Sequence, residues 1–209
     1  MRYLFIALPA LFLLFCGPIQ AQGDMVAGAT AYVSCAACHG AQGGGNRELG
    51  APRLVHLEPV YIETQLQKFK SGLRGGPGAS AAAAQMAGMA ASLSDEQAEQ
   101  NVAAYITTLK GAQSSPTVTG DAVLGGDYYN QFCGACHGAA AQGNLALNSP
   151  RLAGADDWYL KSQLRAFRSG SRGSHPQDRT GRQMRAMAAV LPGEQAIADI
   201  VAFIRSIEP

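Results

Sequence analysis

The sequence has little charge and no excess of either sign. Charged residues make up 15% of its 209 residues, with 16 Lys and Arg against 15 Asp and Glu. A protein that binds nucleic acid non-specifically needs an excess of Lys and Arg on its surface to neutralise the phosphates. The balance gives no support for such a surface, and we expect no nucleic-acid partner.

Long apolar runs are also missing after the first residues. No later segment is long and apolar enough to cross a bilayer, and the apolar run at 3–16 contains Pro9 and falls short of the ~20 residues that a spanning helix needs. Arg2 before this run, and small and polar residues after it, are typical of a secretory signal peptide, which we place at residues 1–21. A membrane anchor and a lipid on Cys16 are the alternatives.

Cysteine is scarce, and after the signal segment it occurs in one repeated motif. Four of the five cysteines belong to the sequences CAACH at 35–39 and CGACH at 133–137. No thiol is left for a disulfide, a nucleophile or a separate zinc site. A zinc site shared by both motifs is the alternative, but ligand pairs of one site rarely lie about 100 residues apart with a His after each pair.

The C-x-x-C-H pattern is the attachment site of c-type haem. Its two cysteines present their sulfurs to the two vinyl groups, and the imidazole that follows reaches the iron. Two copies predict two covalently bound haem c groups. Since such haem is attached outside the energy-transducing membrane, we expect a periplasmic protein. The predicted thioether residues are Cys35, Cys38, Cys133 and Cys136, and the predicted iron ligands are His39 and His137.

The second motif follows the first by 98 residues, and the same spacing relates residues far outside the motifs. We interpret this as the duplication of a whole domain. The matching sequences are P-R-L at 52–54 and 150–152, Y-x3-Q-L-x2-F-x2-G-x-R at 61–74 and 159–172, and M-x2-M-x3-L at 86–93 and 184–191.

The segment between the copies is rich in Gly, Ser, Thr and Pro. It has no helical apolar pattern, which is typical of a linker. We therefore place the first domain at 22–110, the linker at 111–122 and the second domain at 123–209.

Each copy is predicted to be helical, since the alternation that marks β-strands is absent. One helix is expected to run into each C-x-x-C-H motif, another to cover about residues 59–71, and a last one to start at Ser94, where Ser94 and Gln97 form a capping-box pattern. The counterpart of the last helix is expected to start at Pro192. Each copy of roughly 90 residues is small for apolar burial alone, so the haem should supply much of the core.

The residue that fills the second axial position of each iron should recur in both copies. The two remaining histidines do not, since His56 aligns with Gly154 and His175 with Pro77. We interpret both as surface or loop histidines, and the sequence shows no acid–base constellation. The methionines do recur, which predicts a methionine sulfur in each domain, although methionine also fills gaps in cores. The candidate pairs are Met86 with Met184 and Met89 with Met187.

These motifs resemble those of the cytochrome c4 family over the whole chain after the signal segment. The family consists of periplasmic dihaem proteins built from two class I cytochrome c domains. The resemblance implies an all-α fold of two tandem domains, each wrapped around one haem. It also implies Met86 and Met184 as axial ligands, seven residues before Leu93 and Leu191, with the other pair as alternatives.

The resemblance further implies roles for residues between the haem motif and the methionines. The backbone carbonyls of Pro52 and Pro150 would accept a hydrogen bond from the ligand histidines and orient their rings. A proline that only stiffens the loop is the alternative. Hydrogen bonds to haem propionates are implied for two arginines and two tyrosines, which a surface Arg or a core Tyr would resemble. They are Arg53, Arg151, Tyr61 and Tyr159.

An iron closed by His and Met exchanges electrons rather than substrates, and the thioether favours the ferrous form. We therefore expect an electron carrier and not an enzyme. The resemblance implies a respiratory carrier between a quinol-oxidising complex and a terminal oxidase or another reductase. The alternatives are a cytochrome subunit of a periplasmic dehydrogenase complex and a dihaem redox enzyme. Peripheral association with a membrane is also compatible with the sequence.

A basic stretch in the second copy bears on docking. Residues 161–185 hold seven Lys and Arg, with Asp178 as the only acid. Such a stretch could steer an acidic redox partner, at a rate that falls as salt rises. The alternative is a solvated surface whose charge balances the haem propionates.

Overall fold

The computed structural model describes residues 23–208, and in this range the chain is helical. The expected signal segment lies outside the described residues. Within them there is no β-strand, and two isolated bridges, Asn46 with Ala51 and Asn144 with Ser149, occupy equivalent places in the two copies. The prediction of an all-α fold is confirmed.

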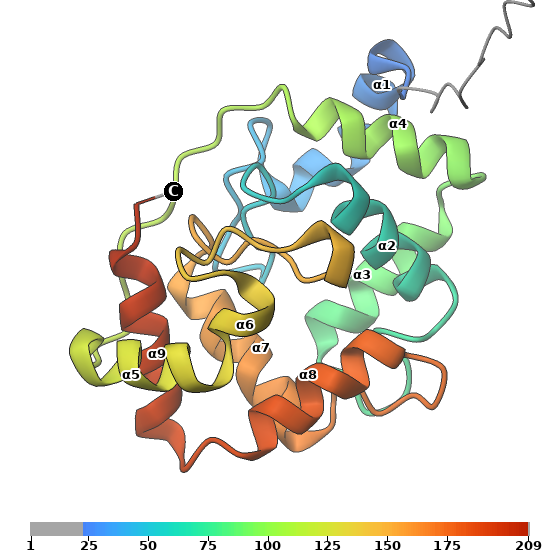
Figure 1. Cartoon of the computed structure of the whole chain (residues 1–209). Coiled ribbons are helices and arrows are strands. Elements are labelled where there is room, and N and C mark those ends of the chain that lie inside the picture. The colour runs from blue at the N-terminus through green and yellow to red at the C-terminus, as the bar shows by residue number, and fades with distance from the viewer. Residues whose placement is uncertain (1–22, 209) are drawn as a thin grey trace, which may run out of the picture.

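The helices form two groups that lie side by side (Figure 1). The first half contains α1 (Met25–His39), α2 (Pro59–Lys70), α3 (Ala81–Ala91) and α4 (Glu96–Ile106). The second half contains α5 (Ala122–Phe132), α6 (Gly134–His137), a 3₁₀ turn (Leu145–Leu147), α7 (Asp157–Ser169), α8 (Arg179–Ala189) and α9 (Glu194–Ser206). Among the described residues no single helix has the length and apolar character of a membrane span, although α8 and α9 reach them together as a pair bent by 114°.

The first and last helices of each half cross at a glycine. A Cβ atom at Gly28 of α1 would collide with the backbone of Asn101 in α4, and one at Gly125 of α5 with the backbone of Asp199 in α9. A residue without a side chain lets the two backbones approach this closely. The crossing therefore fixes the helical segment that leads into each C-x-x-C-H motif.

That helical segment differs between the halves by one residue. Gly28 and Tyr32 correspond to Gly125 and Tyr129, a spacing of 97 rather than 98 residues. The second half thus has one extra residue before its haem motif. The structure absorbs it by breaking the helix at Cys133 (φ −121°, ψ −40°), whereas α1 runs unbroken through its motif.

Two predicted helix starts are wrong. Asp95 caps α4 in place of Ser94: its carboxylate accepts a hydrogen bond from the Ala98 N–H at 2.8 Å, while the Ser94 hydroxyl lies 3.1 Å from that carboxylate and donates to it. A charged carboxylate at a helix N-terminus is a stronger acceptor than a hydroxyl, so the cap moves one residue along. The last helix begins at Glu194, and Pro192 precedes it.

The segment between the halves is bound mainly to the second half. We call residues 111–121 the strap. The Ser114 hydroxyl donates to Asp156 at 2.7 Å, and the Val118 N–H donates to Asp157 at 2.7 Å. These carboxylates stand at the start of α7, so the strap is held by the N-terminus of a helix that also faces the first half.

Candidate haem sites and the interface between them

One cavity of about 530 Å³ is lined by residues from both halves and reaches both C-x-x-C-H motifs. Its apolar wall includes Leu66 and Phe69 of α2 and Leu164 and Phe167 of α7. All predicted site residues line it except Cys136, which is exposed. The predicted site residues in its wall are Cys35, Cys38, His39, Pro52, Met86, Cys133, His137, Pro150 and Met184.

The two predicted ligand histidines are held in the same way. Nδ1 of His39 donates to the carbonyl of Pro52 at 2.8 Å, and Nδ1 of His137 donates to the carbonyl of Pro150 at 2.9 Å. Because a carbonyl oxygen can only accept, Nδ1 carries the proton and Nε2 keeps a free lone pair. Burial lowers the pKa of both rings against the opposing effect of the carbonyl, so both are neutral near pH 7. A neutral imidazole with a free Nε2 is a form that binds a metal ion.

A tyrosine that sequence reasoning missed fixes the turn after each histidine. The hydroxyls of Tyr32 and Tyr129 donate to the carbonyl of the glycine that follows the motif, at 2.8 and 2.7 Å. Burial raises the pKa of Tyr32 to about 12 and also raises that of Tyr129, so both hydroxyls remain donors. The shared pattern G-D-x-V-x-G-x3-Y at 23–32 and 120–129, spaced by 97 residues, is the signal that could have revealed them.

The cavity and its donors fit two haem c groups. Burial raises the pKa of the Cys35 thiol, and burial together with the neighbouring Cys136 raises that of Cys133 to about 11, so both sulfurs are protonated thiols. Four buried nitrogen atoms on the wall have no partner among the described residues, namely His56 Nδ1, Arg74 Nε, Arg151 Nε and Trp158 Nε1. An apolar ring system that carries carboxylate groups matches both the apolar wall and these donors.

The methionines divide by exposure. Met86 of α3 and Met184 of α8 are half-buried and line the cavity. Met89 also reaches the cavity but is 37% exposed, and Met187, which is 39% exposed, is not part of the wall. Met86 and Met184 are therefore the pair that both halves bring to the cavity.

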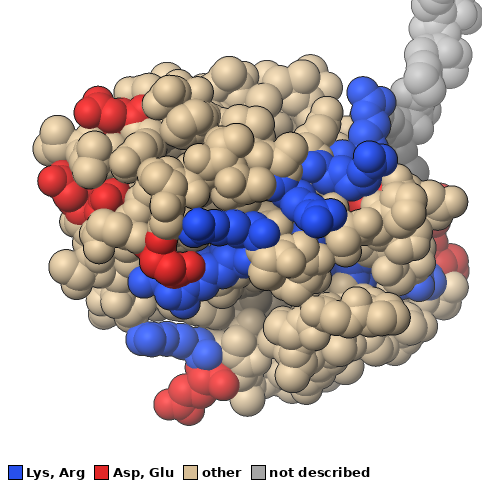
Figure 2. Space-filling view, turned by 90° about the horizontal axis from the view of Figure 1, so that it is seen from below, with Lys and Arg blue, Asp and Glu red and all other residues tan. Residues whose placement is uncertain are grey.

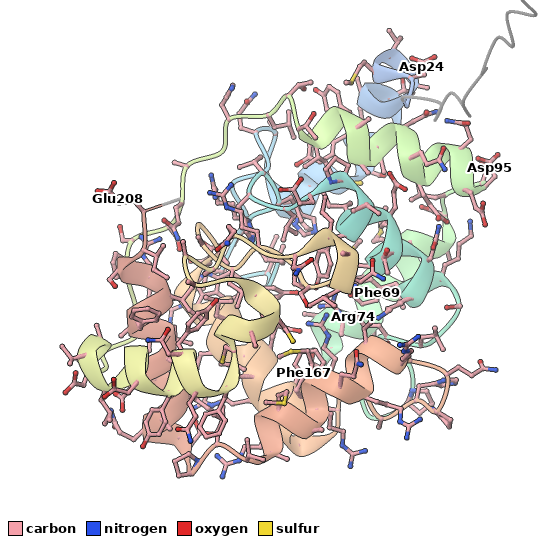
Figure 3. The ribbon with its side chains drawn as sticks, in the orientation of Figure 1. Asp24, Phe69, Arg74, Asp95, Phe167 and Glu208 are labelled. Atoms are coloured by element: carbon pink, nitrogen blue, oxygen red, sulfur yellow. The ribbon has the colours of Figure 1, made fainter. Side chains whose placement is uncertain are left out.

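Two arginines that the duplication relates, Arg74 (labelled in Figure 3) and Arg172, join the halves. Each donates to the repeated glutamine of its own half and to the repeated tyrosine of the other half, and each lies 4.4 Å over a phenylalanine ring of its own half. The two tyrosines expected at haem propionates thus bond to arginines of the opposite half. The bonds are Arg74 to Gln65 (2.8 Å) and Tyr159 (2.7 Å), and Arg172 to Gln163 (2.6 Å) and Tyr61 (3.3 Å).

The loops that follow the two prolines also lie at the interface. Arg53 donates to the carbonyls of Gly154 (2.8 Å) and Gly111 (2.9 Å), whereas Nε of Arg151 has no partner among the described residues. His56 lies in a loop, as expected, and is half-buried: its Nδ1 atom is shielded from solvent, and its side chain lines the cavity. Burial, followed by the charges of Arg53 and Arg151, lowers the pKa of His56 to about 3.

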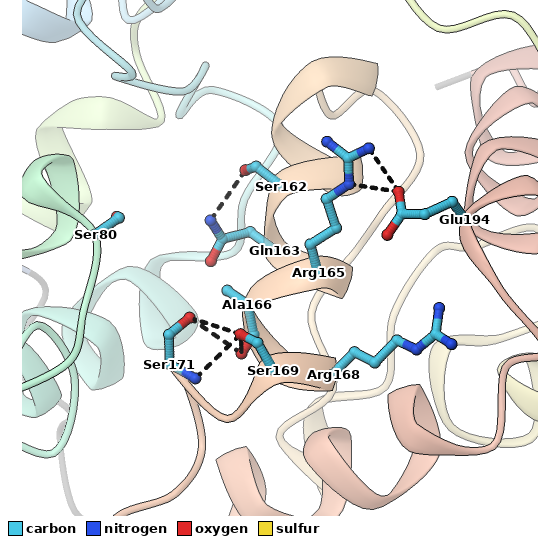
Figure 4. A pocket seen from close by; sticks show the side chains of 9 residues that line it. All are labelled: Ser80, Ser162, Gln163, Arg165, Ala166, Arg168, Ser169, Ser171 and Glu194. Atoms are coloured by element: carbon cyan, nitrogen blue, oxygen red, sulfur yellow. Dashed lines mark hydrogen bonds and ion pairs between the residues drawn. The ribbon is translucent and has the colours of Figure 1, made fainter.

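One ion pair breaks the symmetry of the interface. Lys68 of α2 donates to Asp178, the cap of α8, at 2.7 Å, and both side chains are largely buried. The duplication relates Lys68 to Ala166 and Asp178 to Ser80. At that equivalent place the structure has an open pocket of about 560 Å³, with Ser80 and Ala166 in its wall (Figure 4).

The basic residues of 161–185 do not act as one set. Arg172 faces the interface, and Arg165 pairs with Glu194 at 2.6 Å. In space-filling view, Lys and Arg side chains gather in a band across one face of the molecule (Figure 2). The exposed members of the stretch that form no ion pair among the described residues are Arg168, Arg179, Arg182 and Arg185.

Comparison with known proteins identifies the two halves. The sequence profile of the cytochrome c family matches the chain twice, over residues 25–110 and 122–208. Each match contains one C-x-x-C-H motif, so the chain carries two covalent haem c groups.

Relatives with both domains are similar over most of this chain. A cytochrome c4 of Azotobacter vinelandii is 32% identical over 200 residues, which cover 91% of this chain and 92% of the relative. A thiosulfate dehydrogenase electron acceptor of Stutzerimonas stutzeri (strain A1501) is 34% identical over 168 residues, which cover 76% and 74%. The crystal structure of reduced recombinant cytochrome c4 from Pseudomonas stutzeri matches with a TM-score of 0.68 and 28% identity, over 89% of this chain and 100% of that chain. The chain therefore belongs to the cytochrome c family, as a two-domain, dihaem member of the cytochrome c4 group.

Proposed function

We propose that this dihaem cytochrome is a periplasmic one-electron carrier in which His39 and Met86 hold one iron and His137 and Met184 hold the other. The observation that carries the proposal is that these four side chains line one cavity. An iron with both axial positions filled by the protein offers no position to a substrate. The haem, when bound, supplies reversible one-electron chemistry.

The chain's own residues prepare these sites. The carbonyls of Pro52 and Pro150 hold the proton on Nδ1 and fix the rotation of the rings, so that Nε2 is ready for the iron. The apolar wall from α2 and α7 excludes water, which suits a centre that exchanges electrons only. In this proposal the haem domains are residues 22–110 and 123–209, with the linker at 111–122.

Methionine ligation is tested by the near-infrared sulfur-to-iron band of the oxidised holoprotein. Met86→Leu and Met184→Leu should each remove the contribution of one iron, and each should lower the reduction potential of that haem, because the thioether favours the ferrous form. The matched variants Met89→Leu and Met187→Leu should keep the full band. A full band in Met86→Leu, or ready binding of carbon monoxide by the native reduced protein, would contradict the assignment.

The proposed donor is a quinol-oxidising complex, and the proposed acceptor is a terminal oxidase or another reductase, each with an acidic docking surface. Arg179, Arg182 and Arg185, the exposed arginines of α8, which we call the basic band, support this, because like charges gathered on one helix steer an oppositely charged partner. Stopped-flow oxidation of the reduced holoprotein by the acceptor tests it. Arg179→Glu combined with Arg182→Glu should slow the reaction at low salt, and the difference should vanish at high salt. Unchanged rates at low salt would refute docking through this band.

A second donor is favoured by one comparison. The relative from Stutzerimonas stutzeri is named as an electron acceptor of thiosulfate dehydrogenase, and it aligns with 76% of this chain. In this case the donor is a periplasmic dehydrogenase, and this chain is its electron acceptor. Oxidised holoprotein mixed with thiosulfate dehydrogenase and thiosulfate, and separately with the quinol-oxidising complex and quinol, distinguishes the donors. Fast reduction by the dehydrogenase and not by the quinol-oxidising complex would contradict the first proposed donor and support the second.

A further inference from the structure

The interface holds buried nitrogen atoms to which the protein itself supplies no partner. In the described part of the chain, His56 Nδ1, Arg151 Nε and Trp158 Nε1 are buried and make no hydrogen bond, and all three residues line the cavity. Nearly all buried polar groups in proteins are hydrogen-bonded. Arg151 Nε and Trp158 Nε1 can only donate, and His56 Nδ1 donates whenever it carries a proton, so these atoms call for an acceptor from outside the chain.

The charges of the elements around His56 indicate the chemistry of that acceptor. They are three arginines, which come from the loops after Pro52 and Pro150 and from α9, and two acids, which cap α2 and α7. Asp156 already accepts hydrogen bonds from the Arg53 N–H at 3.0 Å and from Ser114, and Glu58 forms no ion pair among the described residues. The acceptor that fits is an anion. The charged groups are Arg53, Arg151, Arg205, Glu58 and Asp156.

His56 is also a point at which the two halves differ. Its counterpart in the second half is Gly154, which offers only a backbone carbonyl and gives it to Arg53 at 2.8 Å. An imidazole is therefore present once, on one side of the interface.

We propose that His56 and Arg151 form a carboxylate site at the interface that binds a propionate of one haem, and that His56 takes up a proton when that haem is reduced. The proposal rests on the two haem c groups and not on the proposed electron partners. One electron enters the iron and one proton passes from solvent to the imidazole, so charge is balanced.

The physical basis is a reversal of the field at His56. Burial and two guanidinium groups keep the pKa of His56 near 3 in the protein alone, so the ring is neutral. A carboxylate beside the ring acts in the opposite direction and favours the imidazolium. The negative charge added on reduction favours it further, so the reduced protein binds the proton more tightly. The potential of that haem therefore falls as the pH rises through the titration of His56.

Spectroscopic redox titrations of the holoprotein from about pH 5 to 8, the range in which histidine changes charge, test this. In the wild type one of the two potentials should fall as the pH rises. His56→Gln keeps a hydrogen-bond donor but does not titrate, and His56→Gly copies the second half, so both should lose the pH dependence. His175→Gln removes the other histidine to which no iron is assigned and should behave as the wild type.

A wild-type protein whose potentials do not change with pH, or a pH dependence that survives in His56→Gln, would overturn the proposal. The near-infrared band shows whether each variant keeps its haem ligation. A second measurement needs no variant: NMR titration of the His56 ring in oxidised and reduced holoprotein should give a higher pKa in the reduced form. Equal values in both forms would also overturn it.

Discussion

At the scale of single residues, Asp157 shows how one carboxylate organises a segment of backbone. Burial alone would raise the pKa of Asp157, but hydrogen bonds from the N–H groups of Thr117, Val118 and Trp158 outweigh it and hold the pKa below its usual value of 3.8. The charged form is thus the one that the fold prefers. Two of these donors belong to the strap, so ionisation of this side chain is linked to strap binding.

Asp157→Asn should lower the free energy of unfolding at neutral pH by about 1–3 kcal/mol, because an amide presents its own donors to the strap N–H groups. A carboxyl group whose pKa is lower in the folded protein than in the unfolded chain stabilises the fold at every pH above the unfolded-state pKa. This stabilisation is lost as the pH falls through the folded-state pKa. The difference between variant and wild type should therefore be full above about pH 4 and shrink below it. Denaturant titrations followed by circular dichroism measure it. An equal difference near pH 3 would contradict the prediction.

The ion pair between Lys68 and Asp178 predicts a second pair at the equivalent place. Ser80→Asp combined with Ala166→Lys should recreate it, and the double variant should be more stable than the sum of the single variants, by about 0.5–1 kcal/mol, because the pocket there is open to solvent. A double variant whose stability equals the sum of the two single variants would contradict the formation of this second ion pair.

Lys68→Met is the matched loss at the existing ion pair. It leaves the Asp178 carboxylate, 3% exposed, without its cation, and should lower the free energy of unfolding by up to about 3 kcal/mol.

At the scale of elements, the sequence predicted the helices that enter the haem motifs, the middle helices and the last helices, whereas α3 and α8 were missed. α3 reads AAAAQMAGMAA and is almost wholly apolar, so no single apolar face stands out. α8 reads RTGRQMRAMAA and does have a charged and an apolar face, which were overlooked because its counterpart α3 has none. Their methionines were found by repetition. Their placement on helices that face the cavity depends on packing against α2 and α7, which the local sequence does not encode.

The extra residue of the second half was missed for a different reason. Every landmark from the haem motif onward keeps the 98-residue spacing, so the shift to 97 is visible only upstream, at Gly125 and Tyr129. Nothing in the sequence says that the break falls at Cys133. It falls there because the crossing glycine holds the start of α5 and the haem motif holds α6.

The crossing itself can be tested with a matched pair of glycines. Gly28→Ala should destabilise the protein by about 1–3 kcal/mol or more, because its Cβ would collide with the backbone of Asn101 and push α1 away from α4. Gly88→Ala in α3 has open space around its Cβ and should stabilise by up to about 1 kcal/mol, through helix propensity. Thermal unfolding of the two variants measures the contrast. Similar midpoints would contradict a close crossing.

At the scale of the whole molecule, the interface is where sequence reasoning stopped. The repeated Tyr, Gln and Arg can bond within a copy or between copies, and their spacing is the same in both cases. The structure shows that the arginine–tyrosine bonds cross, so the motif that looks like part of one domain holds two domains together. The proposed ligand residues do not have this ambiguity, because each C-x-x-C-H motif and its methionine are proposed to serve one half.

The crossed bonds predict a shift in a tyrosine. Burial would raise the pKa of Tyr159, but Arg74 and Arg172 outweigh it and the pKa is lowered. Arg74→Gln removes one charge and one hydrogen bond, so the pKa of Tyr159 should rise. Carbon-13 NMR of labelled tyrosine in the holoprotein measures it, and Arg165→Gln, which removes a surface pair with Glu194, is the control. An unchanged titration of Tyr159 in Arg74→Gln would contradict the crossed geometry.

The strap decides how the molecule can be divided. The carbonyl of Gly111 accepts a hydrogen bond from Arg53 of the first half, whereas Ser114 and Val118 donate to Asp156 and Asp157, so the strap beyond Gly111 belongs physically to the second half although the sequence marks it as a linker. A second half produced alone from Ala122 would leave both carboxylates without these donors. One that begins at Ala112 would keep them. The place to separate the two haem domains is therefore after Gly111, at the near end of the linker and not at its far end.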